Sequence, residues 1–361
     1  MTRRSLAAAI AVLVLLSACS GTPSPSGSAQ PTPTATPFGT ILPGESASAV
    51  PTGQASPIAA TYTVLPGDSL WSISRAWGTT VAQLQAWNGG AYPSLLTDPN
   101  TVEAGWILVV AEDPDRTPQP TATAPASGCR AGNRVPAGEQ ETLATVPNAD
   151  HGVALTLDMG GRLDPGIDIL NFLIAQGVCA TIFPTGAMTQ TPEGQRIMAI
   201  IGAHPELFEI GNHTMHHCNL VAGGGGSPTT APCAGVEPTA DFIRSELTDA
   251  ATILQQFSGQ EPTPYWRPPF GVTNQAVRDA AASVGYTKTI MWDVDTIDWK
   301  PIADGGPTAE QIATKVVSRA VDGSIVLMHL GGYETLDALE IMVPALRERG
   351  FLLTTVSDQL N

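Results

Sequence analysis

Strand-like runs and helical stretches alternate from about residue 135 to residue 361, and this alternation is the strongest constraint on the fold. The runs typical of buried strands are 153–157, 180–183, 208–211, 288–292, 325–328 and 352–356. The stretches with helical patterns between them are 166–176, 192–203, 239–257, 274–284, 308–320 and 335–349. Such an order predicts an α/β domain in which helices cover a mainly parallel sheet or barrel.

Acidic and basic side chains stand close to the ends of these predicted strands, where catalytic groups collect in α/β folds. They are Asp158, His213, His217, Arg267, Asp298 and His329. Two histidines four residues apart would share one face of a helix, which lets two imidazoles bind one metal ion. A histidine pair alone is more often part of a solvated surface. Here an acid and a third histidine stand at other strand ends of the same sheet edge, which favours a site.

Five segments, in this order, resemble the motifs of the NodB-type polysaccharide deacetylases, which form carbohydrate esterase family 4. The segments are Thr156-Leu157-Asp158-Met159-Gly160, His213-Thr214-Met215-His216-His217, Arg267-Pro268-Pro269-Phe270, Asp295-Thr296-Ile297-Asp298-Trp299 and Leu327-Met328-His329. The resemblance implies a NodB-like distorted (β/α) barrel. It also implies metal-dependent removal of N-acetyl groups from a cell-wall polysaccharide that contains N-acetylglucosamine, with peptidoglycan as the favoured substrate.

The resemblance also implies how the metal and the attacking water are handled. Asp158 matches the base that takes a proton from the water, and Arg267 matches the cation that holds this carboxylate. His213 and His217 match two ligands of a divalent metal, for which zinc is favoured and cobalt and manganese are alternatives.

The other motif residues match groups that act on the acetyl and amine parts of the substrate. The Phe270 backbone N–H matches an oxyanion donor, and Trp299 and Leu327 match apolar walls around the acetyl methyl. Asp298 matches the carboxylate that orients and charges His329, the general acid. These roles agree with what amide hydrolysis requires: an activated water, a stabilised oxyanion and a protonated leaving nitrogen.

Met159 departs from the family pattern, which has an aspartate here as the third metal ligand. A thioether is a poor ligand for zinc. Four outcomes are open: Asp158 leans onto the metal, Asp164 substitutes, water fills the gap, or activity is lost. Cys218, beside His217, is a less favoured soft ligand. Two other functions therefore stay open, a catalytically silent glycan-binding wall protein and a deacylase of O-acetyl groups or other amides.

The N-terminus reads as an export signal. Arg3 and Arg4 precede an apolar run, 6–16, that is too short to span a bilayer. The following Leu-Ser-Ala-Cys resembles the bacterial lipobox, which implies cleavage after residue 18 and a lipid anchor at Cys19 on the outer face of the cell membrane. A plain secretory signal cut near Ala18 is the alternative.

Segments 19–60 and 112–134 are rich in Ser, Thr and Pro and are predicted to be linkers. Between them, 61–111 has a predicted strand–helix–helix–strand (βααβ) order, with Thr79 or Thr80 capping the second helix. The stretch Tyr-Thr-Val-Leu-Pro-Gly-Asp-Ser-Leu-Trp-Ser-Ile resembles a LysM module. This implies N-acetylglucosamine binding at a loop formed by Gly67, Asp68, Ser69 and Leu70. Trp71 and Trp87 are interpreted as core. The deacetylase domain is predicted at 135–361.

Export to an oxidising space favours disulfide bonds among the four cysteines beyond residue 19. Three pairings are open; we favour Cys218 with Cys233, which closes a Gly/Ser/Pro/Thr loop, and hence Cys129 with Cys179. A buried thiol at Cys179 is the alternative. The chain carries 17 basic and 33 acidic side chains, a net charge of −16. This charge argues against nucleic acid as a partner and against electrostatic adhesion to anionic lipid.

Overall fold

The computed structural model describes residues 59–65, 68, 70–96, 102–113, 129 and 134–361. The predicted signal peptide, the lipidation site Cys19 and most of both linkers lie outside these residues. Among the described residues, no helix is long and apolar enough to cross a membrane.

The first folded unit has the expected strand–helix–helix–strand order. It consists of β1 (Ala60–Thr63), α1 (Leu70–Trp77), α2 (Val81–Asn88), the short 3-10 helix η1 (Pro93–Leu96) and β2 (Ile107–Ala111). Strands β1 and β2 pair antiparallel. Thr80 is the N-cap of α2 and forms a capping box with Gln83, which satisfies backbone N–H groups at the helix start.

A small apolar core with one buried amide holds this unit together. Leu84 is buried in it, and Trp87 packs against it, as expected. The buried side chain of Asn88 links α2 to β2: its Nδ2 donates to the Val109 carbonyl at 2.8 Å, and its Oδ1 accepts from the Val109 N–H at 2.7 Å. The side chain of Trp71 is outside the described part.

The second unit contains two parallel sheets. The larger comprises β4 (Gly152–Met159), β5 (Ala180–Pro184), β6 (Phe208–Ile210), β9 (Val294–Asp295), β10 (Ser324–His329) and β11 (Leu352–Thr354). Its order is β6-β5-β4-β10-β9, and β11 also pairs with β4. The smaller, in the order β3-β8-β7, comprises β3 (Glu141–Leu143), β7 (Tyr265–Trp266) and β8 (Lys288–Ile290). A parallel bridge between Asn212 and Trp266 links the two sheets. The predicted α/β class with a parallel sheet is confirmed.

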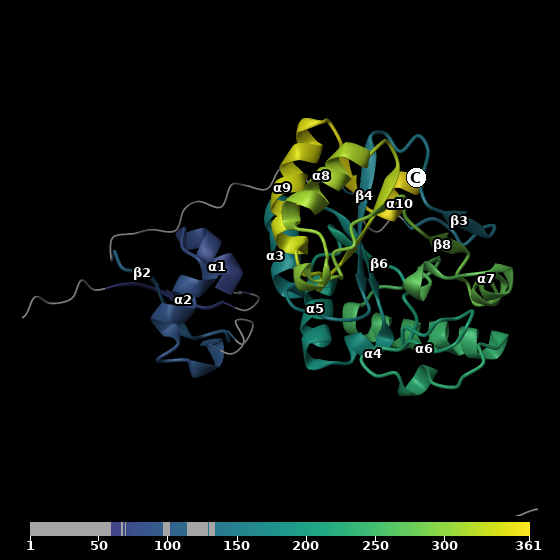
Figure 1. Ribbon diagram of the computed structural model, residues 1–361, viewed down its shortest axis with the longest axis horizontal. Coiled ribbons are helices and arrows are strands. Elements are labelled where there is room, and N and C mark those ends of the chain that lie inside the picture. The colour runs from purple at the N-terminus through teal and green to yellow at the C-terminus, as the bar shows by residue number, and fades with distance from the viewer. Residues whose placement is uncertain (1–58, 66–67, 69, 97–101, 114–128, 130–133) are drawn as a thin grey trace, which may run out of the picture. The chain divides into compact units, whose positions relative to one another are not determined.

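Helices surround these sheets (Figure 1). They are α3 (Gly166–Gln176), α4 (Gly186–Thr189), α5 (Pro192–Ala203), α6 (Ala240–Ser258), α7 (Gln275–Ala282), α8 (Ala309–Arg319), α9 (Thr335–Glu348) and α10 (Val356–Leu360). Figure 1 shows α3, α8 and α9 together on one side of β4, with α7 beside β8 on the other. Threonine or asparagine side chains cap α5, α6, α7 and α8, which explains why their starts were predictable.

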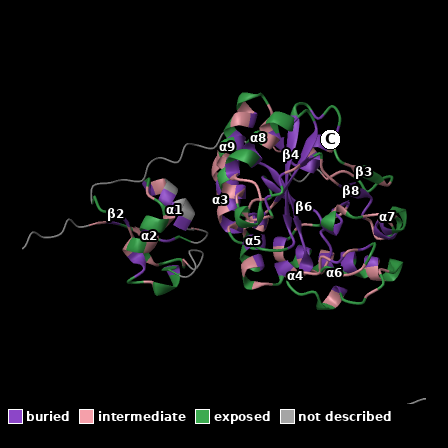
Figure 2. Cartoon of the chain, in the orientation of Figure 1, coloured by how far each residue is buried: buried purple, intermediate pink, exposed green. Residues whose placement is uncertain are grey.

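Strand β4 is buried along its whole length and runs through the middle of the domain (Figure 2). Its alternate residues Leu155, Leu157 and Met159 join the main apolar core. Because side chains alternate along a strand, Thr156 and Asp158 lie on the opposite face. This alternation separates the polar group that faces the candidate site from the methionine beside it.

Both expected disulfides are present. Cys129 pairs with Cys179, with 6.0 Å between the Cα atoms, and ties the entry segment to the residue before β5. Cys218 pairs with Cys233, with 5.4 Å between the Cα atoms, and closes a loop after β6. The alternative of a free buried thiol at Cys179 is therefore wrong.

Candidate active site

The candidate site lies where β4 and β10 end side by side. Asp158 and His329 are register partners on these two parallel strands, so the predicted base and acid are held by neighbouring backbones. Asp158 is only 6% exposed, and His329 is partly exposed. The structure thus brings together two residues that are 171 positions apart in the sequence.

Arg267 anchors the carboxylate of Asp158 from below. Its guanidinium is fully buried and donates to Asp158 Oδ1 at 2.7 Å and to Thr156 Oγ1 at 2.9 Å. It also donates to the carbonyl oxygens of Ile290 at 3.0 Å and Met291 at 3.2 Å. Because Nε, Nη1 and Nη2 of Arg267 all donate hydrogen bonds, the guanidinium is a positive charge held in a fixed position.

This charge keeps Asp158 ionised. Burial alone would raise the pKa of Asp158, but the guanidinium of Arg267 and the nearby histidines outweigh it, and the pKa lies below its ordinary value. Oδ1 is taken by Arg267, and Oδ2 lies 3.5 Å from His213 Nε2. Asp158 is therefore an ionised carboxylate with one oxygen turned toward the histidines.

His213 is oriented by its own second nitrogen. It is buried, and its Nδ1 lies 2.8 Å from the carbonyl oxygen of Arg267, so Nδ1 carries the proton and donates it to that carbonyl. Nε2 is then the unprotonated nitrogen. Burial lowers the pKa of His213, which keeps the ring neutral as a metal ligand must be.

His217 lies beside His213, but not on a helix. The prediction that the two histidines share a helical face is wrong, because Thr214 and His217 have φ angles of 70° and 60° and the segment is a loop. The two ring centroids are nevertheless 4.8 Å apart in an edge-to-face arrangement. Burial and the neighbouring His213 lower the pKa of His217 to about 3.

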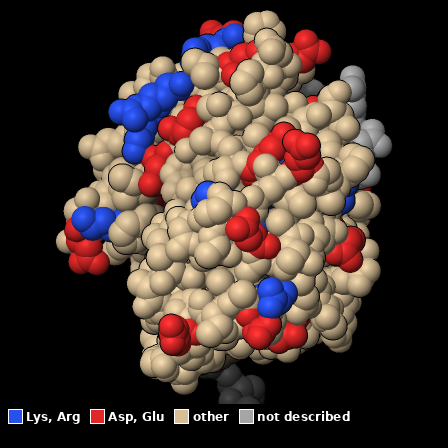
Figure 3. Space-filling model, turned by 90° about the vertical axis from the view of Figure 1, so that its right-hand side faces the viewer, with Lys and Arg blue, Asp and Glu red and all other residues tan. Residues whose placement is uncertain are grey.

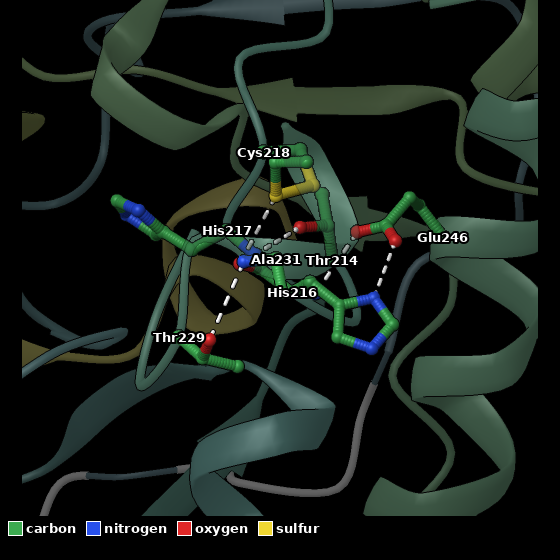
Figure 4. Close-up of a disulfide and its surroundings, with 8 residues drawn as sticks. Thr214, His216, His217, Cys218, Thr229, Ala231 and Glu246 are labelled. Atoms are coloured by element: carbon green, nitrogen blue, oxygen red, sulfur yellow. Dashed lines mark hydrogen bonds and ion pairs between the residues drawn. A yellow bond between two sulfur atoms is a disulfide. The ribbon is translucent and has the colours of Figure 1, made fainter. Parts of the chain in front are cut away.

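Two buried polar residues that the sequence analysis missed hold this loop. Asn212 Oδ1 accepts from the Thr214 N–H at 2.8 Å, while its Nδ2 donates to Tyr286 Oη at 2.7 Å. Glu246, on α6, binds both the backbone N–H and Nδ1 of His216, at 2.9 and 2.7 Å. Figure 4 shows the His216 ring turned to Glu246 and the His217 ring on the other side of the loop. Asn212 immediately precedes the histidine motif, which was a usable signal; Glu246 had none.

Asp298 and His329 form the second charged pair. Asp298 is buried; its Oδ1 lies 2.7 Å from His329 Nδ1, and its Oδ2 accepts from the His329 N–H at 2.8 Å and from the Thr335 hydroxyl. Burial lowers the pKa of His329, but the Asp298 hydrogen bond and the charges of Asp298 and Asp158 outweigh it and raise the pKa. This imidazole is therefore biased toward its charged form.

The three residues predicted to contact substrate lie at different depths. Phe270 is exposed, has a φ of 61°, and packs its ring edge-to-face on His217 with 4.6 Å between centroids. Trp299 is 55% exposed. Leu327 is buried on β10, and by alternation it lies on the same face as His329.

The residues present fit a divalent metal only in part. Two neutral imidazoles lie together, and a Cβ added at Gly160 would come within 2.7 Å of His217 and 3.1 Å of His213, so a glycine leaves room between strand and rings. Among the described residues, however, no three His, Cys, Asp or Glu side chains converge as a ligand group. The structure thus supplies two imidazole ligands and the free oxygen of Asp158 nearby.

The other candidates for a third ligand are engaged elsewhere. The Met159 side chain is fully buried in the apolar core. The Asp164 carboxylate forms an ion pair with Arg162. Cys218 is bonded to Cys233. Of the four outcomes considered for Met159, substitution by Asp164 therefore has no support in this arrangement, and neither has Cys218 as a soft ligand.

The predicted glycan-binding loop of the small unit is described only in part. The carboxylate of Asp68 accepts from Tyr62 Oη and from the Leu65 N–H, both at 2.7 Å. Burial, followed by the hydrogen bond to Asp68 and its negative charge, raises the pKa of Tyr62 to about 12. Leu70 is buried. Gly67 and Ser69 lie outside the described residues. The Asp68 carboxylate therefore links the Tyr62 side chain to the Leu65 backbone.

Family models match both units. The model described as polysaccharide deacetylase matches residues 145–289, and the LysM domain model matches residues 62–111. A peptidoglycan-N-acetylglucosamine deacetylase from Bacillus cereus is 30% identical over 220 residues, covering 60% of this chain and 91% of the relative. A peptidoglycan-N-acetylmuramic acid deacetylase from Bacillus subtilis is 26% identical over 206 residues, covering 57% and 70%.

The fold also matches solved structures. A CE4 (carbohydrate esterase family 4) pseudoenzyme from Bacillus anthracis superimposes with a TM-score of 0.51 and 26% identity, over 62% of this chain and 70% of that one. A mutant of that pseudoenzyme with restored enzymatic activity matches with a TM-score of 0.51 and 27% identity, over 62% and 72%. With the Bacillus cereus relative covered over nearly its whole length, the chain belongs to the polysaccharide deacetylases of carbohydrate esterase family 4, here preceded by a LysM domain.

Proposed function

We propose that the protein is an exported, metal-dependent deacetylase that hydrolyses the N-acetyl groups of N-acetylglucosamine in a cell-wall glycan, with peptidoglycan as the favoured substrate. The observation that carries the proposal is the pairing of two opposite charge states on neighbouring strands. Arg267 pairs with Asp158, whose pKa is lowered, while Asp298 pairs with His329 and raises its pKa, which favours the charged imidazole. Hydrolysis of an amide requires such a base and such an acid within reach of one bond.

In this proposal His213 and His217 hold the metal, for which zinc is favoured. A divalent ion bound there would polarise the acetyl carbonyl and make the attacking water more acidic. Because Nδ1 of His213 is occupied by the Arg267 carbonyl, Nε2 is the nitrogen available for the ion. The remaining positions would go to water, substrate or the free oxygen of Asp158.

The chain's own residues then perform the proton transfers. Asp158 accepts a proton from the water through its free oxygen, and Arg267 keeps that carboxylate in place. His329 donates a proton from Nε2 to the leaving nitrogen, because Nδ1 is engaged by Asp298. The amine leaves as a neutral group, and the acetyl group leaves as acetic acid, which loses the second proton of the attacking water to solvent and becomes acetate.

Substrate contacts are assigned to Phe270, Trp299 and Leu327. The backbone N–H of Phe270 would donate to the oxyanion, and the side chains of Trp299 and Leu327 would enclose the acetyl methyl. Figure 3 shows one face of the molecule, on which small groups of acidic and basic side chains are separated by wide uncharged areas.

The remaining assignments concern location. Cleavage after residue 18 and a lipid at Cys19 would anchor the protein to the outer face of the cell membrane. The linkers 19–60 and 112–134 would then extend the LysM domain, 61–111, and the deacetylase domain, 135–361, toward the wall. A LysM domain that binds the same glycan would raise the local substrate concentration.

A catalytically silent glycan-binding protein is the second candidate. The burial of Met159 in the core favours it, because within the described part of the chain no group of three His, Cys, Asp or Glu side chains is placed to hold a metal ion. The structural similarity to a pseudoenzyme of the same family points the same way.

Acetate release and metal content together distinguish the two candidates. The proposal predicts that purified protein supplied with zinc, cobalt or manganese releases acetate from N-acetylated peptidoglycan, and that His213→Ala abolishes this. His204→Ala is the matched control, because His204 is paired with Glu206 on the surface outside this site. A wild-type protein that carries no stoichiometric metal and releases no acetate from any N-acetylated glycan would instead establish the silent binder. O-acetylated wall polymers, tested in parallel, decide which bond is cut.

Met159→Asp tests the ligand set directly. If the substitution raises both metal content and turnover, the wild-type site is a weakened version of the family's. If it raises neither, the wild-type site uses its own ligand set.

A further inference from the structure

The loop from Cys218 to Cys233 begins directly after the second candidate metal ligand, His217. His217 immediately precedes Cys218, and the disulfide joins the two ends of the loop. Both cysteines are buried, so the bridge is part of the domain interior rather than a surface link. Between them lie four consecutive glycines, 223–226, all with positive φ.

The returning arm of this loop pairs with the histidine segment. The Gly226 N–H donates to the His217 carbonyl at 3.1 Å, and the Ser227 N–H donates to the His216 carbonyl at 3.0 Å. Cys218 and Gly225 form an antiparallel bridge. The C-terminal end of the loop is held as well, because the Gly224 N–H donates to the Cys233 carbonyl at 3.1 Å. These contacts restrain the backbone of His217, whose φ of 60° is unfavourable for a residue with a side chain.

The same arm also reaches the His217 ring through Phe270. A Cβ added at Gly225 would lie 3.0 Å from the Phe270 ring and 3.1 Å from the His217 carbonyl oxygen. The Phe270 ring packs on the His217 ring. The loop therefore fixes the histidine in two ways, through the backbone carbonyl and through the aromatic ring against which the imidazole rests.

We propose that the disulfide-closed loop, residues 218–233, is a positioning element that holds His217 in the conformation required for binding the metal, and that Gly225 is its contact point. This inference rests on the proposed metal-dependent function. With only two histidines available as ligands, the orientation of each should weigh more on affinity than in a site with three. Figure 4 shows the bridge directly beside the histidine segment.

Two glycine substitutions provide a matched test. Gly224 and Gly225 have almost the same φ, 78° and 81°, so alanine incurs a similar backbone cost at either position. A Cβ at Gly224 meets nothing within 4 Å, whereas one at Gly225 meets Phe270 and His217. In the full chain, zinc affinity is measured by competition with a chromophoric chelator, and the visible spectrum of bound cobalt reports the ligand geometry.

We expect Gly225→Ala to weaken zinc binding about tenfold and to alter the cobalt spectrum. Tenfold is the lower limit of the effect usually found when a residue that orients a metal ligand is replaced. Gly224→Ala should stay within about twofold of wild type. Equal affinities for the two variants, with both thermal unfolding temperatures alike, would overturn the inference.

The disulfides give a second matched pair. Cys218→Ala with Cys233→Ala should weaken zinc binding by about tenfold or more, while Cys129→Ala with Cys179→Ala leaves it unchanged in protein that is still folded. Equal weakening in both double variants would indicate a general loss of stability and contradict the proposal. If the first double variant does not fold, the glycine pair decides alone. A wild-type chain that binds none of zinc, cobalt and manganese overturns the proposed function together with this inference, whereas unaffected variants of a metal-binding chain overturn only the inference.

Discussion

Replacing Arg267 by methionine is expected to lower the free energy of unfolding by about 3–5 kcal/mol at pH 7. The variant keeps the bulk of the side chain but removes the guanidinium that pairs with Asp158, whose carboxylate is buried. It also leaves the Ile290 and Met291 carbonyls without that donor. Most of the loss should come from the uncompensated carboxylate, because a buried charge without its partner is far more costly than a lost neutral hydrogen bond.

The stability deficit of Arg267→Met should change with pH in a direction set by the pKa of Asp158. In the wild type the pKa of Asp158 lies below its ordinary value, so the ionised carboxylate stabilises the fold above about pH 4, and this contribution is lost as the pH falls through the folded-state pKa. Without Arg267, we expect burial, the largest single influence on this group, to raise the pKa of Asp158 above the unfolded value. The carboxylate then destabilises the fold as the pH rises, so the deficit of Arg267→Met should shrink between pH 7 and about pH 5.

The assay is urea unfolding with a chelator present, so that metal does not contribute. Asp158→Asn is measured alone and combined with Arg267→Met. The combined variant should lose about 2 kcal/mol less than the two single losses added together, since it buries no unpaired charge. Arg196→Met, which removes a surface ion pair with Glu193, is the control and should cost less than about 1 kcal/mol. Strict additivity of the two site variants, or a deficit independent of pH, would refute the electrostatic account.

Three further outcomes are expected. Asp298→Asn should reduce kcat/KM by about 100-fold or more and move the alkaline limb of the pH profile to lower pH, because the pKa of His329 loses the partner that raises it; an unmoved limb in a pH–rate series would contradict this. Met159→Leu should cost less than about 1.5 kcal/mol in thermal unfolding, whereas Met159→Asp should cost about 2–5 kcal/mol without metal; equal costs would mean that this side chain is not packed in the core. Asn88→Ala should accelerate hydrogen exchange of the Val109 amide by about tenfold or more in the full chain, and unchanged exchange would show that the Asn88 bridge contributes little.

The sequence predicted the longer helices and strands of the large domain, for identifiable physical reasons, but not the short elements β3, β7, β9, α4 and α10. The helices α3 and α5 begin and end at the residues expected, because a threonine cap followed by proline marks the start of α5 and Gly177 in a left-handed conformation ends α3. Strand β11 was predicted two residues too long, since Thr355 caps the short helix α10 instead of continuing the strand.

Local pattern failed where tertiary contacts set the backbone. The spacing of His213 and His217 fits a helix, yet the segment is a loop in which Thr214 and His217 have positive φ. The side chains of Asn212 and Glu246 accept hydrogen bonds from backbone N–H groups of this loop, and the returning arm of the disulfide-closed loop pairs with it. No periodicity encodes these contacts, because Glu246 lies 30 residues away on α6. The sequence likewise does not show where the Met159 side chain lies; in the structure, alternation along β4 places it in the apolar core.

The left-handed residues around the site have a consequence for how this fold can change over generations. Thr214, His217, Phe270 and Ile297 all have φ between 60° and 70°, and each such residue costs of the order of 1 kcal/mol relative to glycine. A population selected for heat resistance alone should accumulate glycine at these four positions, so that its proteins gain thermal stability and lose the activity of the site. Retention of side chains there, in lineages that have diverged elsewhere, would be a record of selection for what the site does.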